Sequence, residues 1–173
     1  MAKYAVVRTD KLWGTDDRAG MASAKYMGSG SAATAIENGN VVKLSELLAI
    51  DATAGTYERE IYKAVTPAAN DSLEVIGLVA TPEVMYDETK KDLELFRNEA
   101  GEIARVYRLH HGDIFSVTAE AIQGTASRGS IIELQAGTKL KAVSSATSGS
   151  TTIGKCIEVA PAGKYTFYVI EVA

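Results

Sequence analysis

The alternation of apolar and polar positions predicts a chain built mainly from short β-strands. Residues 60–65 alternate between the two classes, and Pro67 follows them. Residues 75–80 form a continuous apolar run, which is typical of a strand buried on both faces. Strand-like runs then recur about every ten residues between glycine turns, a spacing typical of an antiparallel barrel or sandwich. These runs are residues 103–109, 114–118, 130–134, 139–143, 153–159 and 165–172.

The first forty residues follow a different pattern. Residues 4–9 resemble a short strand, but residues 10–40 are rich in Gly, Ser and Ala and contain few large apolar side chains. Such a segment buries little surface of its own, so we expect residues 1–40 to form an extended N-terminal arm and residues 41–173 a single β-rich domain. Its large side chains are candidate anchors for a protein partner: Trp13, Met21, Tyr26 and Met27. Trp13 can equally pack on the chain's own barrel.

Helical patterns are scarce, and the last strand is apolar on both faces. Residues 87–96 are the best helix candidate, with Leu93 and Phe96 three positions apart among charged helix formers. The expected fold is therefore mainly β, a barrel or sandwich with the N-terminal arm and at most one or two short helices. Because successive strand residues point to opposite faces, Tyr165, Phe167 and Tyr168 cannot all enter one core. Both faces of that strand should be covered, by another element or by a neighbouring chain.

Composition and charge narrow the class of protein. The 173 residues are 46% hydrophobic and 23% charged, as expected for a single globular domain. The 22 acidic and 18 basic residues include no dense Lys/Arg cluster, so a nucleic acid is not an expected partner. No apolar run reaches the roughly 18 residues that cross a membrane, so no membrane partner is expected. Lys3 and Arg8 interrupt the N-terminal region where a signal peptide would be apolar.

Residues that could carry chemistry lack the partners that chemistry needs. The single cysteine, Cys156, excludes an internal disulfide and a multi-thiolate metal site. His110 and His111 are adjacent, so on a strand they face opposite ways and cannot bind one metal together. The glycines and serines of residues 28–31 lack the Gly-Lys-Ser/Thr continuation of a phosphate-binding loop. The serines of residues 144–150 lack a catalytic frame. We therefore expect no catalytic residues, no metal, no cofactor and no enzymatic activity.

Several segments along the chain resemble a known family. They are residues 1–4 with 7–10, then 34–40, 60–67, 80–88, 109–117 and 132–140. Together they resemble small accessory head proteins of tailed bacteriophages that infect Gram-positive bacteria, the kind encoded beside the major capsid protein. The resemblance implies a capsid decoration protein, a β-rich domain on the outside of the shell that reinforces contacts between capsomers. It brings no catalytic residues.

The expected function is that of a structural virion protein made in the host bacterial cytoplasm and located on the capsid surface. It would bind the outer surface of the phage major capsid protein, stabilise the head and associate with further copies of itself as a homo-oligomer. The alternative is a phage tail or neck component, or a host-surface binding module, on a similar β-barrel. A small enzyme would require a deep pocket lined by His110, His111 and carboxylates.

Overall fold

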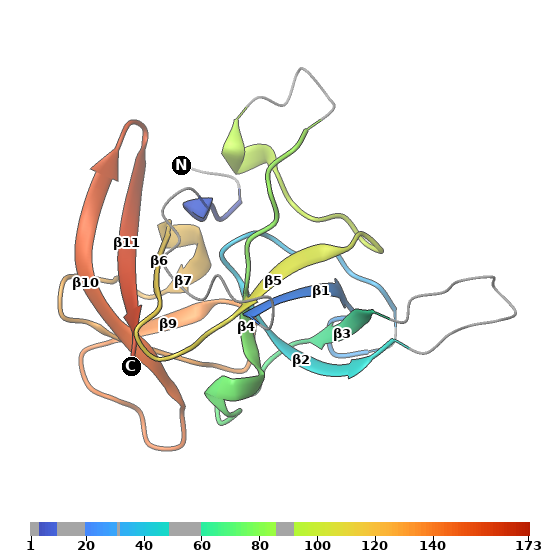
Figure 1. Ribbon diagram of the computed structural model, residues 1–173. Coiled ribbons are helices and arrows are strands. Elements are labelled where there is room, and N and C mark those ends of the chain that lie inside the picture. Colours follow the sequence, from blue (N-terminus) through green and yellow to red (C-terminus); the bar gives the residue numbers. More distant parts are fainter. Residues whose placement is uncertain (1–3, 10–19, 31, 49–59, 86–91) are drawn as a thin grey trace, which may run out of the picture.

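The computed structural model describes residues 4–9, 20–30, 32–48, 60–85 and 92–173, and it is mainly β, as the sequence predicts. Five strands form a closed barrel in the order β1, β3, β2, β4, β5, with β5 paired back to β1 (Figure 1). Their bounds are β1 Met21–Tyr26, β2 Val41–Leu47, β3 Ile61–Val65, β4 Ile76–Val79 and β5 Ala104–Arg108. Neighbouring strands are antiparallel except β1 and β3, which run parallel.

The interior of the barrel is filled by small side chains. A barrel of few strands has a narrow interior, so residues that face inward must be small. The buried cluster inside it is accordingly dominated by alanine and valine: Ala22, Ala24, Ile36, Val42, Leu44, Ala64, Val79, Ala104 and Val106. Gly77 on β4 has no room for a side chain, because a Cβ there would overlap Val106 Cγ1 and lie 3.1 Å from the Tyr107 carbonyl oxygen.

The rest of the chain forms a six-stranded sheet in the order β6, β11, β10, β8, β9, β7. The bounds are β6 Ile114–Val117, β7 Ile122–Gln123, β8 Ile131–Glu133, β9 Leu140–Val143, β10 Thr152–Ala162 and β11 Tyr165–Val172. The glycine-punctuated spacing therefore predicted this region correctly as strands. The pairs are antiparallel except β7 with β9, which the sequence pattern does not reveal.

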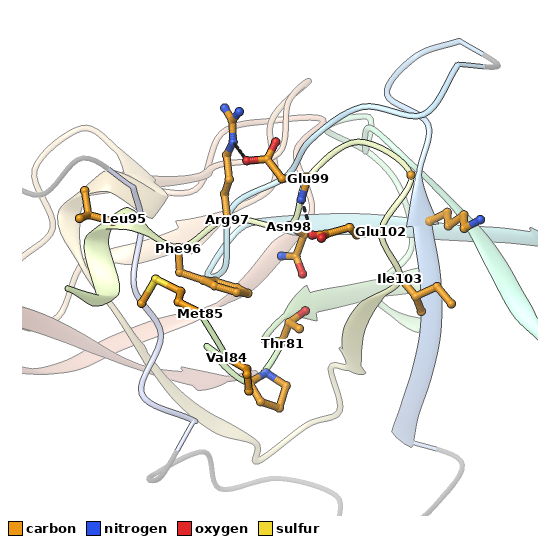
Figure 2. A pocket seen from close by; sticks show the side chains of 13 residues that line it. Thr81, Val84, Met85, Leu95, Phe96, Arg97, Asn98, Glu99, Glu102 and Ile103 are labelled. Atoms are coloured by element: carbon orange, nitrogen blue, oxygen red, sulfur yellow. Dashed lines mark hydrogen bonds and ion pairs between the residues drawn. The ribbon is translucent and has the colours of Figure 1, made fainter. Parts of the chain in front are cut away.

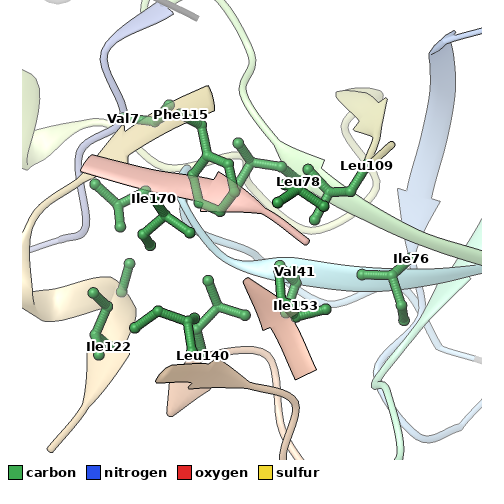
Figure 3. Packing of buried hydrophobic residues seen from close by; sticks show 14 of the residues in the cluster. Val7, Val41, Ile76, Leu78, Leu109, Phe115, Ile122, Leu140, Ile153 and Ile170 are labelled. Carbon is green, nitrogen blue, oxygen red and sulfur yellow. The ribbon is translucent and has the colours of Figure 1, made fainter. Parts of the chain in front are cut away.

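The largest core lies between the sheet and the barrel (Figure 3). Val41 on β2 and Ile76 and Leu78 on β4 point outward from the barrel into a cluster with residues of the second sheet. The sheet contributes Phe115, Val117, Ile132, Leu134, Leu140, Ile153, Cys156, Ile170 and Val172, among others. Strand β4 is therefore buried on both faces, which explains the continuous apolar run at residues 75–80.

The described part of residues 1–40 belongs to this fold. Ala5, Val6 and Val7 are buried, and Val7 bridges Val117 at the edge of β6. Strand β1 lies between β3 and β5 and closes the barrel. The expectation that this segment contributes little to the core is therefore wrong, because alanines suffice to fill a narrow barrel. A boundary after residue 40 does not separate two units.

Strands β10 and β11 form a long hairpin whose two faces meet different parts of the molecule. Its two-residue turn starts at Gly163, whose φ of +63° is the left-handed conformation that a type II′ turn requires at that position. Tyr168 packs against the large core, whereas Phe167 is buried with the Arg8 guanidinium 5.5 Å from its ring centre. Both faces are thus covered within the chain, as the aromatic pattern of this strand predicted.

Three single-turn 3-10 helices lie wholly within the described residues, at Leu73–Val75, Leu93–Leu95 and Ala119–Ala121. The helix expected at residues 87–96 appears only as the short turn at Leu93–Leu95, and residues 87–91 lie outside the described part of the chain. Phe96, whose spacing from Leu93 predicts a helix, instead lines the groove described below.

Candidate functional site

The structure places the predicted anchors in different environments. Trp13 lies outside the described residues. Met21 is exposed on β1, with its sulfur 3.8 Å from an Arg105 guanidinium nitrogen. Tyr26 packs against the barrel interior, and its hydroxyl hydrogen-bonds the Thr66 hydroxyl at 2.7 Å. Met27 is half-buried directly after β1. Met21 is therefore the most accessible of the three anchors that the structure describes.

A groove of about 650 Å³ lies on the barrel side of the molecule. Figure 2 shows Val84, Met85 and Phe96 on one side of it and Ile103 on the other. Val84 is 62% exposed and Ile103 is 50% exposed, the two highest values among the large apolar side chains of the described residues. Charged side chains at its rim are Lys25, Arg97, Glu99 and Glu102. The groove thus combines an accessible apolar surface with a polar rim, as protein-binding surfaces do.

Two buried asparagines hold the walls of this groove together. Asn98 donates from its side chain to the Ile36 carbonyl oxygen at 3.2 Å and to Asn38 Oδ1 at 3.3 Å. Asn38 in turn donates to the Thr81 carbonyl oxygen at 2.8 Å and accepts from the Thr81 amide at 3.0 Å. Three segments distant in sequence are therefore tied by buried and partly buried hydrogen bonds, which makes the groove a fixed part of the fold.

The outward face of strands β1, β3 and β5 adjoins the groove, because Lys25 and Ile103 line the groove at its margin. Ala22, Ala24 and Ala64 point into the barrel, so the alternate positions of these strands point outward. We call this surface the basic face. Its residues are Met21, Ser23, Lys25, Ile61, Lys63, Val65 and Arg105. The second sheet covers Val41 on β2 and Ile76 and Leu78 on β4, whereas Met21 and Arg105 remain exposed.

The serine-rich loop at residues 144–150 is held by a buried carboxylate. Glu133 is fully buried and accepts hydrogen bonds from the Lys141 ammonium at 2.9 Å and from the Thr147 amide at 2.9 Å. Burial would raise the pKa of Glu133, but these hydrogen bonds outweigh it and hold the pKa below its usual value. This carboxylate therefore has a structural role in anchoring the loop.

The other chemistry-bearing residues lie apart from the groove. His110 sits in an exposed turn, where its amide donates to Asp113 Oδ2 at 2.8 Å. Cys156 is buried in the core, and burial raises the pKa of its thiol. Among the described residues, no three His, Cys, Asp or Glu side chains are grouped so that they could hold a metal ion. The described part of the chain contains no helix long and apolar enough to span a membrane.

The comparisons with known proteins gave no match. No family model fits the chain, and neither the curated proteins nor the solved structures contain one that matches it. The groove and the basic face were not apparent from sequence. Their residues come from segments far apart in the chain, and only the strand register brings them together.

Proposed function

We propose that this protein is a structural virion protein that binds the outer surface of a phage major capsid protein and stabilises the head. The observation that carries a protein-binding role is the gathering of exposed apolar side chains in one region of the barrel. Val84 and Ile103, the two most exposed of the six large apolar side chains that are exposed in the described residues, both line the groove. Single exposed apolar residues are normal, but contiguous ones mark interaction surfaces.

The rigidity of the barrel supports a stabilising role. A closed barrel has no free strand edge, and the asparagine network fixes the loops beside it. A surface that is already ordered before binding loses little conformational entropy when the complex forms. Such a surface can reinforce a shell repeatedly with the same geometry. The resemblance of segments along the chain to accessory head proteins supports a phage capsid as the shell.

The test is co-sedimentation of the purified protein with shells of the phage that encodes it, prepared without this protein. We expect saturable binding in many copies per shell. Ile103→Asp should weaken binding by about tenfold or more, because it places a carboxylate in the apolar part of the contact. The matched control is Val159→Asp on β10, an exposed apolar position on the second sheet, which should bind like wild type.

Absence of wild-type binding to the shells would contradict the proposed function. Binding of only a few copies at one vertex would instead assign the protein to the tail or neck. Loss of binding by Val159→Asp together with full binding by Ile103→Asp would place the contact on the second sheet. A thermal melt of each variant verifies that the compared proteins are folded.

A further inference from the structure

One wall of the groove begins in a turn that has no apolar anchor. Leu95 and Phe96 line the groove (Figure 2), and they end and directly follow the 3-10 helix Leu93–Leu95. No residue of this helix is buried, and Leu93 is 38% exposed. Burial of apolar side chains is the main force that fixes an element on a fold. The position of this turn therefore depends on polar contacts.

The tip of the β10–β11 hairpin supplies such contacts. Lys164 lies in the two-residue turn of the hairpin, and its ammonium is 3.0 Å from Asp92 Oδ1 and 2.9 Å from Glu94 Oε2. Asp92 directly precedes the 3-10 helix, and Glu94 is its middle residue. The Tyr4 amide also donates to the Glu94 carbonyl oxygen, at 3.0 Å. We call Asp92, Glu94 and Lys164 the clamp.

The two carboxylates of the clamp share one lysine. The hydrogen bond from Lys164, followed by one from Tyr165, holds the pKa of Glu94 below its usual value, although the nearby Asp92 carboxylate opposes this. The same hydrogen bonds to Glu94 and Asp92 raise the pKa of Lys164. Glu120 lines the small cavity beside this contact, so the surroundings of Lys164 are acidic. Without the lysine, like charges would remain next to one another at the turn.

The backbone of the turn links the clamp to the groove. The Leu95 amide donates to the Asp92 carbonyl oxygen at 2.9 Å, so a shift of Asp92 moves a residue that lines the groove. The other end of this wall is fixed by Asn98, whose amide donates to the Ile36 carbonyl oxygen at 2.9 Å. The wall thus has one support in the barrel and one at the tip of the hairpin.

We propose that Lys164 is a positioning residue for the capsid-binding surface, which holds the groove wall in place from the hairpin without contacting the shell. The inference rests on the proposed function and identifies a part of the chain outside the groove on which binding depends. The clamp is partly exposed, so its loss should change the overall stability little. Its loss should instead let the wall move, and the wall must then be ordered again on binding.

Hydrogen–deuterium exchange of the free protein tests the clamp without any shell. The Leu95 and Phe96 amides are hydrogen-bonded within the turn, and they should exchange faster in Lys164→Gln than in wild type. Exchange of the Asn98 amide should not change. Lys164→Arg should restore the wild-type rates because it keeps the charge. The matched control is Lys155→Gln, which removes the same charge from an exposed position of β10. High salt should bring the wild-type rates towards those of Lys164→Gln.

Co-sedimentation with shells tests the link between the clamp and binding. Lys164→Gln should bind about threefold to tenfold more weakly than wild type, with a Tm within a few degrees of it. Glu94→Gln should also weaken binding, and combining it with Lys164→Gln should add little, because both changes remove the same contact. Lys164→Arg and Lys155→Gln should bind like wild type.

The outcomes separate this inference from the proposed function. Unchanged exchange of the Leu95 and Phe96 amides in Lys164→Gln would overturn the inference. Faster exchange with wild-type affinity would also overturn it, while leaving the proposed function intact. Equal losses of affinity in Lys164→Gln and Lys155→Gln would indicate a general effect of charge and count against it. Failure of wild type to bind shells overturns the proposed function, and the exchange rates then still decide whether the clamp holds the wall.

Discussion

Removal of residues 1–33 is expected to prevent cooperative folding, because the deletion takes away the strand that closes the barrel. The deleted part contains two valines that are at most 2% exposed, Val6 and Val7. Burial of a valine stabilises a fold by about 1.5–3 kcal/mol, so this pair contributes about 3–6 kcal/mol. The methyl groups of Ala5, Ala22 and Ala24 add about 2 kcal/mol at about 0.8 kcal/mol each. The sum is comparable with the roughly 5–15 kcal/mol of free energy that stabilises a whole domain.

The assay is thermal and denaturant unfolding of the truncated chain, followed by circular dichroism. Two point variants on β1 make the test specific to the barrel. Ala24→Glu buries an unpaired carboxylate in the narrow interior and should cause a similar loss of stability, whereas Ser23→Glu points outward and should change it little. A truncated chain that unfolds cooperatively within a few degrees of the full chain would refute the reasoning. So would equal effects of the two point variants.

Three further outcomes follow from the packing. Gly77→Ala should lower the free energy of unfolding by about 1–3 kcal/mol, because its new methyl group meets Val106. Val106→Ala removes the facing methyl groups, so the double variant should lose less stability than the two single variants lose in sum. Phe167→Ala should cost about 3–5 kcal/mol in denaturant titrations, and a loss under about 1 kcal/mol would contradict its burial beneath Arg8. The pKa of Glu133 is lowered in the folded protein. Its carboxylate therefore adds to the free energy of unfolding above its unfolded pKa near 4.5, and this contribution is lost as the pH falls through the pKa of the folded protein. The Tm advantage of wild type over Glu133→Gln should therefore shrink from pH 7 to pH 3, and a constant difference would refute this.

The second half of the fold could be predicted from sequence because its signals are local. Glycine turns and period-two alternation mark each strand from residue 103 onward, and the two-residue turn at Gly163 has the residue that its backbone conformation requires. The pattern also required that both faces of β11 be covered. The structure meets this requirement within one chain, because Tyr168 packs on the core and Phe167 lies against Arg8.

The N-terminal strand could not be recognised because its burial uses small side chains. Hydrophobic patterns detect cores through large residues, and β1 contributes only Ala22 and Ala24 to the inside of the barrel, with Tyr26 partly buried at its end. The Gly, Ser and Ala of residues 10–40 therefore predict an arm that buries little surface. In the structure, the narrow interior of a five-stranded barrel makes alanine a suitable inward-facing residue.

The candidate site depends even more on long-range register. Lys25 and Lys63 are neighbours only because β1 pairs with β3 in parallel, and no local pattern specifies that pairing. Met21 is a candidate anchor on sequence grounds, as a large apolar residue in a polar stretch, and its role in binding stays a prediction. Val84 and Ile103 lie in loops beside strands, where exposure depends on how distant segments pack.

An electron cryo-microscopy map of shells saturated with this protein shows directly which face of the molecule meets the shell. We expect the groove and the adjoining outward face of β1, β3 and β5 to contact the shell, with Ile103 at the interface. We also expect the β10–β11 hairpin to make no contact with the capsid protein. A map in which the hairpin and the second sheet form the contact, with the basic face toward solvent, would contradict this expectation.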